Sequence, residues 1–185
     1  MALSLPNALT WARIAAIPLI VGLFYMPYPW ADPAAGVLFA VAGITDSLDG
    51  YFARRLGQIS RLGAFLDPVA DKLIVAVALV LLVSKDTRAL IVLTAAVIIG
   101  REITISALRE WMAEIGARRK VAVSQLGKYK TILQITGLSM MLYRIPLFGL
   151  IPTYKLGVGL TEVAALATLV SMGMYLRAAW PELRR

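Results

Sequence analysis

The chain has 185 residues, of which 59% are hydrophobic and only 16% are charged, and its mean hydropathy is +0.76. This composition is too apolar for an ordinary water-soluble domain and indicates a membrane protein. The sequence contains neither cysteine nor histidine, which excludes disulfides, thiol nucleophiles, thiolate metal sites and histidine bases, so any chemistry must use carboxylates, hydroxyls, Lys, Arg or Tyr.

Six apolar runs, each near the roughly 20 residues needed to cross a bilayer, follow one another along the chain. Proline, glycine and charged residues separate them. They predict an all-α, polytopic membrane protein with six transmembrane helices in a single domain, residues 1–185. The first run lacks the basic start and the cleavage site of a signal peptide, so we expect it to be retained. The expected spans cover residues 7–28, 33–54, 64–84, 88–110, 126–145 and 155–177.

Basic residues are concentrated on one side of these six spans. An even number of spans puts both termini on the same side, and cytoplasmic loops carry the excess of Lys and Arg, so we expect both termini to be cytoplasmic. The net charge of +8 fits this topology and attraction to anionic lipid better than nucleic-acid binding, because the bases lie between apolar spans. The cytoplasmic bases would be Arg54, Arg55, Arg61, Arg118, Arg119, Lys120, Lys128, Lys130, Arg177, Arg184 and Arg185, against Lys85, Arg88, Arg144 and Lys155 outside.

The second and third expected spans contain four aspartates. Asp46 and Asp49 are three residues apart and Asp67 and Asp71 four apart, so each pair lies on one helix face. The short turn between the two helices makes them antiparallel neighbours, which can bring the pairs together near the cytoplasmic end. One Asp at the centre of a span costs about 2.5–3.5 kcal/mol, so bound cations must offset the cost of placing four aspartates there. Oxygen ligands favour Mg²⁺ or Mn²⁺, and two such ions can promote in-line displacement at phosphorus.

Other roles for these aspartates remain open. Asp67 could cap a helix that starts at the proline after it. The first pair could form ion pairs with Arg54 and Arg61, although neither explanation accounts for all four acids. Carboxylates inside spans are also found in divalent-cation transporters, but the outer halves of these spans hold no matching acids.

The run DSLDGYFARRLGQISRLGAFLDPVAD, residues 46–71, resembles the signature of the CDP-alcohol phosphatidyltransferase family. That signature reads D-x2-D-G-x2-A-R-x8-G-x3-D-x3-D, and the chain meets every fixed position. The segments PNALTWAR, FLDPVADKL, GREITISALREWMAE and LGKYKT are similar to the bacterial members whose acceptor is sn-glycerol 3-phosphate. The resemblance covers most of the chain and is weakest in the last expected span.

The resemblance implies an enzyme of the bacterial inner membrane that transfers the phosphatidyl group of CDP-diacylglycerol to sn-glycerol 3-phosphate at the cytoplasmic face and releases CMP. It also implies a homodimer. A sister enzyme that uses an inositol phosphate or phosphatidylglycerol as acceptor is the nearest alternative. The family would place two Mg²⁺ or Mn²⁺ ions on Asp46, Asp49, Asp67 and Asp71, make Asp71 the general base as well, and line the CDP-diacylglycerol pocket with Gly50, Ala53, Arg54 and Gly63. Gly50 suits close helix packing equally well.

The family signature leaves the acceptor open, and basic residues supply a hypothesis for it. Arg101 lies deep in the fourth span and needs a partner, and Arg109 lies eight residues on, roughly on the same side. Together with Lys128 and Lys130 they predict a cationic pocket for a dianionic phosphate, which argues against choline, ethanolamine or serine. Alternatively, Arg101 pairs with Glu102 or with an aspartate of the cluster, and the other three bases anchor the loops at the lipid surface.

Three polar residues near the start of the first span are spaced three apart. Asn7, Thr10 and Arg13 could contact the nucleotide or the lipid phosphate of the substrate, and Asn7 is equally suited to capping a helix. The basic run at residues 118–120 is typical of contact with lipid headgroups.

Overall fold

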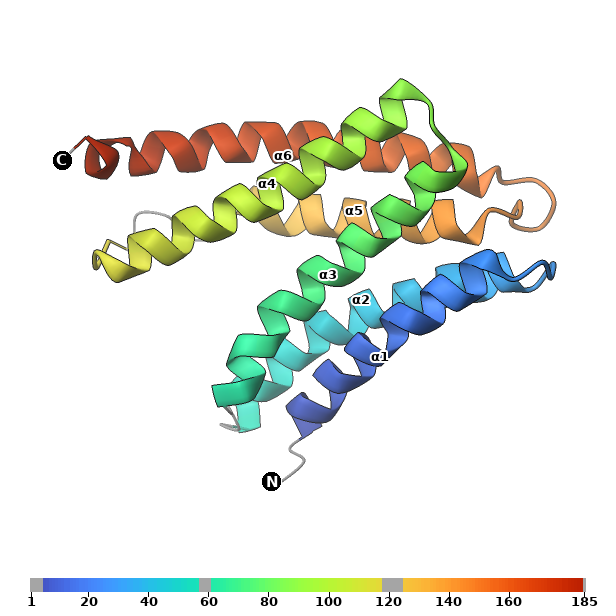
Figure 1. The fold of residues 1–185 in the computed structure, drawn as a ribbon, viewed down its shortest axis with the longest axis horizontal. Coiled ribbons are helices and arrows are strands. Elements are labelled where there is room, and N and C mark those ends of the chain that lie inside the picture. The colour runs from blue at the N-terminus through green and yellow to red at the C-terminus, as the bar shows by residue number, and fades with distance from the viewer. Residues whose placement is uncertain (1–4, 57–60, 118–124, 185) are drawn as a thin grey trace.

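The structure is a computed structural model that describes residues 5–56, 61–117 and 125–184, with side chains described for 8–45, 66–117 and 129–184. The described residues form helices and, apart from one isolated bridge between Leu147 and Ile151, no β-structure. The helices are α1 (Leu5–Tyr25), α2 (Ala31–Leu56), α3 (Arg61–Lys85), α4 (Ala89–Glu114), α5 (Gln125–Tyr143) and α6 (Thr153–Leu183) (Figure 1).

The all-α prediction is confirmed, and each helix begins close to the start of an expected span. The largest differences lie at the C-terminal ends of α4 and α6, which continue to Glu114 and Leu183. Both extensions have one physical cause. Met112 of α4 is fully buried against Tyr175 and Ala179 of α6, in a small apolar cluster that is separate from the main core.

Three of the described helices are long and apolar enough to cross a membrane: α1 over Ala8–Tyr25, α4 over Ala89–Glu114 and α6 over Thr153–Leu183. In α2 a shorter apolar segment covers Ala31–Thr45. Many large apolar side chains lie on the outside of the bundle, in the way that helices facing lipid are apolar all round. The protein is therefore membrane-associated.

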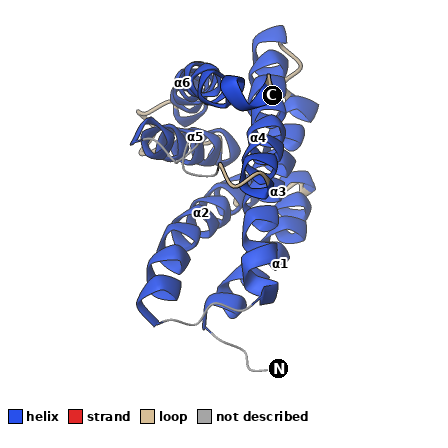
Figure 2. Cartoon of the chain, turned by 90° about the vertical axis from the view of Figure 1, so that its left-hand side faces the viewer, coloured by secondary structure: helices blue, strands red, loops and turns tan. Residues whose placement is uncertain are grey.

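The helices form two layers. In Figure 2, α1, α3 and α4 lie on one side and α2, α5 and α6 on the other. The connections α1–α2, α3–α4 and α5–α6 lie toward the right of Figure 1, away from the start of α1 and the end of α6. The layers meet in a core that includes Phe24, Phe39, Leu82 and Leu142. We call the end that holds these three connections the loop end.

Helices α5 and α6 pack most extensively against each other, and glycines allow it. A Cβ atom built on Gly157 would lie 2.6 Å from the carbonyl oxygen of Gly137, closer than real Cβ contacts come. One turn further along α6, the hydroxyl of Thr161 donates a hydrogen bond to the Gly157 carbonyl at 2.8 Å. Small residues that let helix backbones approach are a usual device of membrane bundles, and here they join α5 to α6.

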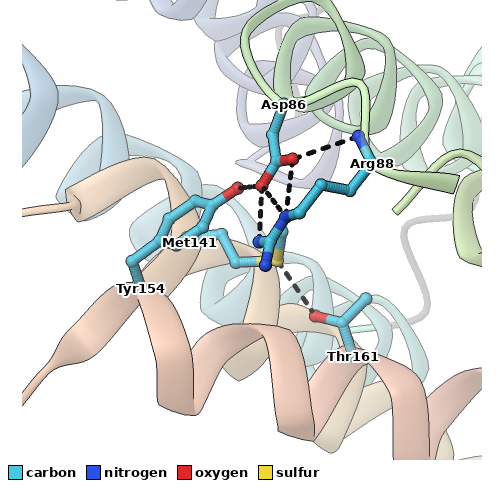
Figure 3. Close-up of polar contacts among 5 residues, drawn as sticks. All are labelled: Asp86, Arg88, Met141, Tyr154 and Thr161. Atoms are coloured by element: carbon cyan, nitrogen blue, oxygen red, sulfur yellow. Dashed lines mark hydrogen bonds and ion pairs between the residues drawn. The ribbon is translucent and has the colours of Figure 1, made fainter. Parts of the chain in front are cut away.

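A polar cluster, which we call the loop-end clamp, ties the α3–α4 connection to the start of α6. The Tyr154 hydroxyl donates to Asp86 Oδ2 at 2.5 Å, and Nη2 of Arg88 donates to the same oxygen at 2.7 Å (Figure 3). The hydrogen bonds from Arg88 and Tyr154 hold the pKa of the Asp86 carboxyl well below its usual range. The clamp therefore favours an ionised Asp86.

We expect Asp86→Asn to lower the thermal midpoint in detergent at pH 7, through a loss of about 1–2 kcal/mol of hydrogen-bond energy. Because the pKa of Asp86 is depressed in the folded state, its contribution is fully present above the unfolded pKa of about 3.9 and declines as the pH falls below it. Thermal unfolding followed from pH 7 down to about pH 3 should show the gap between wild type and variant narrowing below about pH 4.

Asp32→Asn is the matched control, since Asp32 pairs with Lys85 at a longer 3.8 Å at the same end of the molecule. It should cost less stability at pH 7. A gap for Asp86→Asn that stays constant over this range of pH would contradict the role of the ionised carboxylate.

Candidate active site

A cavity of about 860 Å³ lies among the first five helices, within the size range of small-molecule sites. Arg13 of α1 and Gly43 of α2 reach it, and most of its charged lining comes from α3 and α4. The charged residues along its walls are Arg13, Asp67, Asp71, Lys72, Arg101, Glu102, Arg109 and Glu110.

The α3 wall of the cavity carries two of the predicted carboxylates. Each accepts a hydrogen bond from α1: the Thr10 hydroxyl donates to Asp67, and Nη1 of Arg13 donates to Asp71 Oδ1 at 2.5 Å. Thr10 and Arg13 are almost completely buried, whereas the Asp71 side chain is 38% exposed. The carboxylates are thus held from behind by α1 while they remain accessible from the cavity.

The alternative that Asp67 caps a helix is wrong. Helix α3 begins at Arg61 and continues through Pro68, which lies inside it. Asp67 is therefore an interior helix residue, and its side chain is available to the cavity and to Thr10. Thr10, which we expected to contact the substrate, is not among the described residues that line the cavity. Its hydroxyl donates to Asp67.

Several predicted site residues lie outside the described side chains. Helix α2 nevertheless continues as a helix through positions 46 and 49 to Leu56. Position 46 follows the cavity-lining Ala42 by four residues and Gly43 by three, which is the spacing of one helix face. The predictions for the side chains of Asn7, Asp46, Asp49, Gly50, Ala53, Arg54, Gly63 and Lys128 fall outside the described residues.

The chemistry of the described wall fits a hard divalent cation. No group of three or more acidic, histidine or cysteine side chains forms a metal site within the described residues, which include only two of the four aspartates. Those two, Asp67 and Asp71, present carboxylate oxygens to one cavity from adjacent turns of one helix. Oxygen ligands of this kind match the preference of Mg²⁺ and Mn²⁺.

The α4 wall carries the positive charge. Arg101 and Arg109 both line the cavity, as their shared helix face predicts. Nη1 of Arg101 donates to Glu102 Oε1 at 3.0 Å, so the pairing that we gave as an alternative is present in the structure. Lys130 of α5 donates to the same Glu102 oxygen at 2.7 Å. One carboxylate thus joins two of the predicted acceptor-binding cations.

On the α4 and α5 walls of the cavity, two buried polar side-chain atoms have no hydrogen-bond partner within the described part of the chain. They are Nε of Arg101 and Oε1 of Gln134. Buried polar groups in native proteins are almost always paired, and exceptions commonly mark a ligand or ordered water. These two atoms therefore indicate a place near α4 and α5 that a polar ligand or an ordered water occupies.

Sequence reasoning missed several cavity residues. Glu102 and Ser106 precede the predicted Arg109 on α4 at intervals of four and three residues, and this polar row in an otherwise apolar span was a signal that could have found them. Gln134 is an amide flanked by apolar residues in the middle of α5 and gave a similar signal. Lys72 follows Asp71 directly, and nothing in the sequence distinguished it from a lipid-facing anchor.

Comparisons with known proteins identify the family of the chain. The profile of the family described as CDP-alcohol phosphatidyltransferase matches residues 3–175. A CDP-diacylglycerol–glycerol-3-phosphate 3-phosphatidyltransferase of Pseudomonas fluorescens is 50% identical over 183 residues, which cover 98% of this chain and 93% of that protein. Proteins of the same name from Salmonella choleraesuis and Shigella flexneri serotype 5b are both 47% identical, covering 97% and 99% of this chain and 96% and 98% of their own lengths. The chain belongs to the CDP-alcohol phosphatidyltransferase family.

Proposed function

We propose that this chain transfers the phosphatidyl group of CDP-diacylglycerol to sn-glycerol 3-phosphate, giving phosphatidylglycerol phosphate and CMP. The observation that carries the proposal is one cavity with carboxylates on its α3 wall and guanidinium groups on its α4 wall. Such a cavity can hold a phosphorus centre between a site for hard cations and a site for a second phosphate. The similar relatives carry the name of this activity, which supports the same acceptor here.

The reaction needs a base for the acceptor hydroxyl, and we assign this role to Asp71. Arg13 fixes one carboxylate oxygen of Asp71 from the buried side, and the cavity gives access to the carboxylate. The 1-hydroxyl of the acceptor gives its proton to Asp71 as its oxygen attacks the phosphorus that bears diacylglycerol. The bond from that phosphorus to the CMP oxygen breaks, and CMP leaves with the electron pair.

Members of this family generally depend on a divalent metal. Asp46, Asp49, Asp67 and Asp71 would hold two Mg²⁺ or Mn²⁺ ions, which would neutralise the charge of the diphosphate and of the departing CMP. Thr10 acts behind this set by orienting Asp67. The pocket for CDP-diacylglycerol would include Asn7, Gly50, Ala53, Arg54 and Gly63.

The acceptor phosphate would bind at the α4 wall. Arg101 and Arg109 line it, and Nε of Arg101, which has no hydrogen-bond partner among the described residues, is a further donor. Guanidinium groups suit a dianionic phosphate because they give charge and paired donors together. Lys128 and Lys130, at the start of α5, would complete the cationic set.

The proposed topology has six spans in one domain, with both termini and the active site at the cytoplasmic face of a bacterial inner membrane. The connections at the loop end carry few bases, whereas most bases fall at the other end, which the positive-inside rule assigns to the cytoplasm. At 1.5 Å per residue, α2 and α3 would reach roughly 38–39 Å and α5 roughly 28 Å, compared with a bilayer core of about 30 Å. A homodimer is part of the proposal.

Release of CMP from CDP-diacylglycerol by the purified protein tests this function. We expect release to require sn-glycerol 3-phosphate and Mg²⁺ or Mn²⁺, and to stop when EDTA removes the metal. Inositol 1-phosphate and phosphatidylglycerol serve as alternative acceptors in parallel. Release with one of these and not with glycerol 3-phosphate would reassign the acceptor, and no release with any acceptor would refute transfer.

A further inference from the structure

We infer that Glu102 is a positioning residue for the acceptor, because it holds the Arg101 and Lys130 side chains together as one phosphate-binding unit. The inference rests on the proposed function and adds to it an acidic residue in a pocket that must bind an anion. Glu102 is outside the family signature.

The contacts make Glu102 the link between the cavity and Lys130. Lys130 is 3% exposed and does not line the cavity, whereas Glu102 and Arg101 do. The Lys130 ammonium donates to Glu102 Oε1 at 2.7 Å, and Nη1 of Arg101 donates to that same oxygen at 3.0 Å. The influence of Lys130 on a ligand in the cavity therefore depends on its contact with Glu102.

The dependence of the two cations on Glu102 is unequal. Nη2 of Arg101 also donates to Ser171 at 3.2 Å, and its guanidinium lies 5.8 Å from the Tyr175 ring centroid, so Arg101 has supports on α6. Within the described residues, Glu102 is the one hydrogen-bond partner found for the Lys130 ammonium. Loss of the carboxylate would therefore release Lys130 more than Arg101.

Charge explains why an acid is useful at an anion site. Two buried cations next to each other repel, and a shared carboxylate offsets this while it leaves the trio with a net charge of +1. Arg101 Nε stays without a protein partner in the described part of the chain and can bind phosphate. Glu102 thus preorganises the cationic wall before the acceptor arrives, which lowers the cost of ordering long side chains on binding.

The test compares Glu102→Gln with wild type by steady-state release of CMP. Gln keeps the length and one acceptor oxygen of Glu but removes its charge. We expect the KM for glycerol 3-phosphate to rise by about tenfold while the KM for CDP-diacylglycerol stays near wild type. Glu114→Gln, at the exposed end of α4 and not among the residues that line the cavity, is the matched control and should change neither KM.

A double-mutant cycle separates positioning from a general charge effect. Lys130→Met should raise the KM for glycerol 3-phosphate, and adding Glu102→Gln to it should raise that KM little further, since Glu102 acts through Lys130. An unchanged acceptor KM in Glu102→Gln, equal rises in both KM values, or fully additive effects in the double variant would overturn the inference. If Glu102→Gln does not fold, Glu102→Asp, which draws the carboxylate back by one methylene, must show the same selective rise.

The same experiment distinguishes the inference from the function on which it rests. Wild-type protein that releases no CMP with glycerol 3-phosphate refutes the proposed acceptor. If wild-type protein does release CMP with glycerol 3-phosphate and the Glu102→Gln variant has an unchanged acceptor KM, only the role of Glu102 is refuted.

Discussion

Asp71→Asn is expected to lower kcat for CMP release by about 10²–10⁴-fold, the range that a positioned general base contributes. Asn has nearly the same shape and can still accept the hydrogen bond from Arg13, but it cannot take up a proton from the acceptor hydroxyl. It also removes one carboxylate from the proposed metal set. The measurement is single-turnover CMP release at saturating substrate and metal, so that weakened binding does not imitate lost chemistry.

Stability must be followed in the same variant, because Asp71 is the ion-pair partner of a buried arginine. The Arg13 side chain is 1% exposed, and a buried charge that loses its counter-charge is destabilising. Asp32→Asn provides a control at the loop end, where no effect on the rate is expected. An Asp71→Asn protein that folds and keeps more than about a tenth of the wild-type rate would rule out Asp71 as the base.

Gly157→Ala is expected to destabilise the bundle by about 1–3 kcal/mol, the usual cost of forcing a methyl group into a packed interface. The new Cβ would lie 2.6 Å from a backbone oxygen of α5 and 2.9 Å from Met141 Cγ, so α5 and α6 must move apart. In an open helical position the same change would favour the helix, because Ala has the higher propensity. The loss should therefore appear as a lower thermal midpoint in detergent.

Gly159→Ala is the matched control for this effect. It lies two residues further along α6, where a Cβ atom would meet nothing within 4 Å. Its midpoint should equal or exceed that of wild type. Equal midpoints for the two alanine variants would show that the close approach at Gly157 does not limit stability.

The helices could be predicted from the sequence because apolar length and punctuation determine where a membrane helix runs. The ends of the helices were predicted less well where tertiary packing extends them. Met112, for example, packs against α6 and lies beyond the expected end of α4. Pro68 gave a misleading signal at the other end of a helix. A proline suggests a helix start, but Pro68 lies inside α3. Local preferences do not reveal that neighbouring helices support such a position.

The candidate site was only partly predictable for a similar reason. The common helix face of Arg101 and Arg109 follows from their spacing, and the structure places both on the cavity. That Thr10 and Arg13 meet the α3 carboxylates depends on α1 packing against α3, which no local pattern specifies. The bridging position of Glu102 depends in turn on the approach of α5.

The loop-end clamp also has a mechanical consequence. Asp71 and Asp86 are fifteen residues apart along and just beyond α3, a separation of about 22 Å at the rise of an α-helix. The hydrogen bond between Tyr154 and Asp86 thus anchors the chain just beyond the end of α3 to the start of α6. A rotation of α3 by about 5° around that anchor would carry Asp71 through about 2 Å, more than the misplacement of about 1 Å that can cost a large factor in rate. A substitution at Tyr154 could therefore alter turnover from the far end of the helix without touching the cavity.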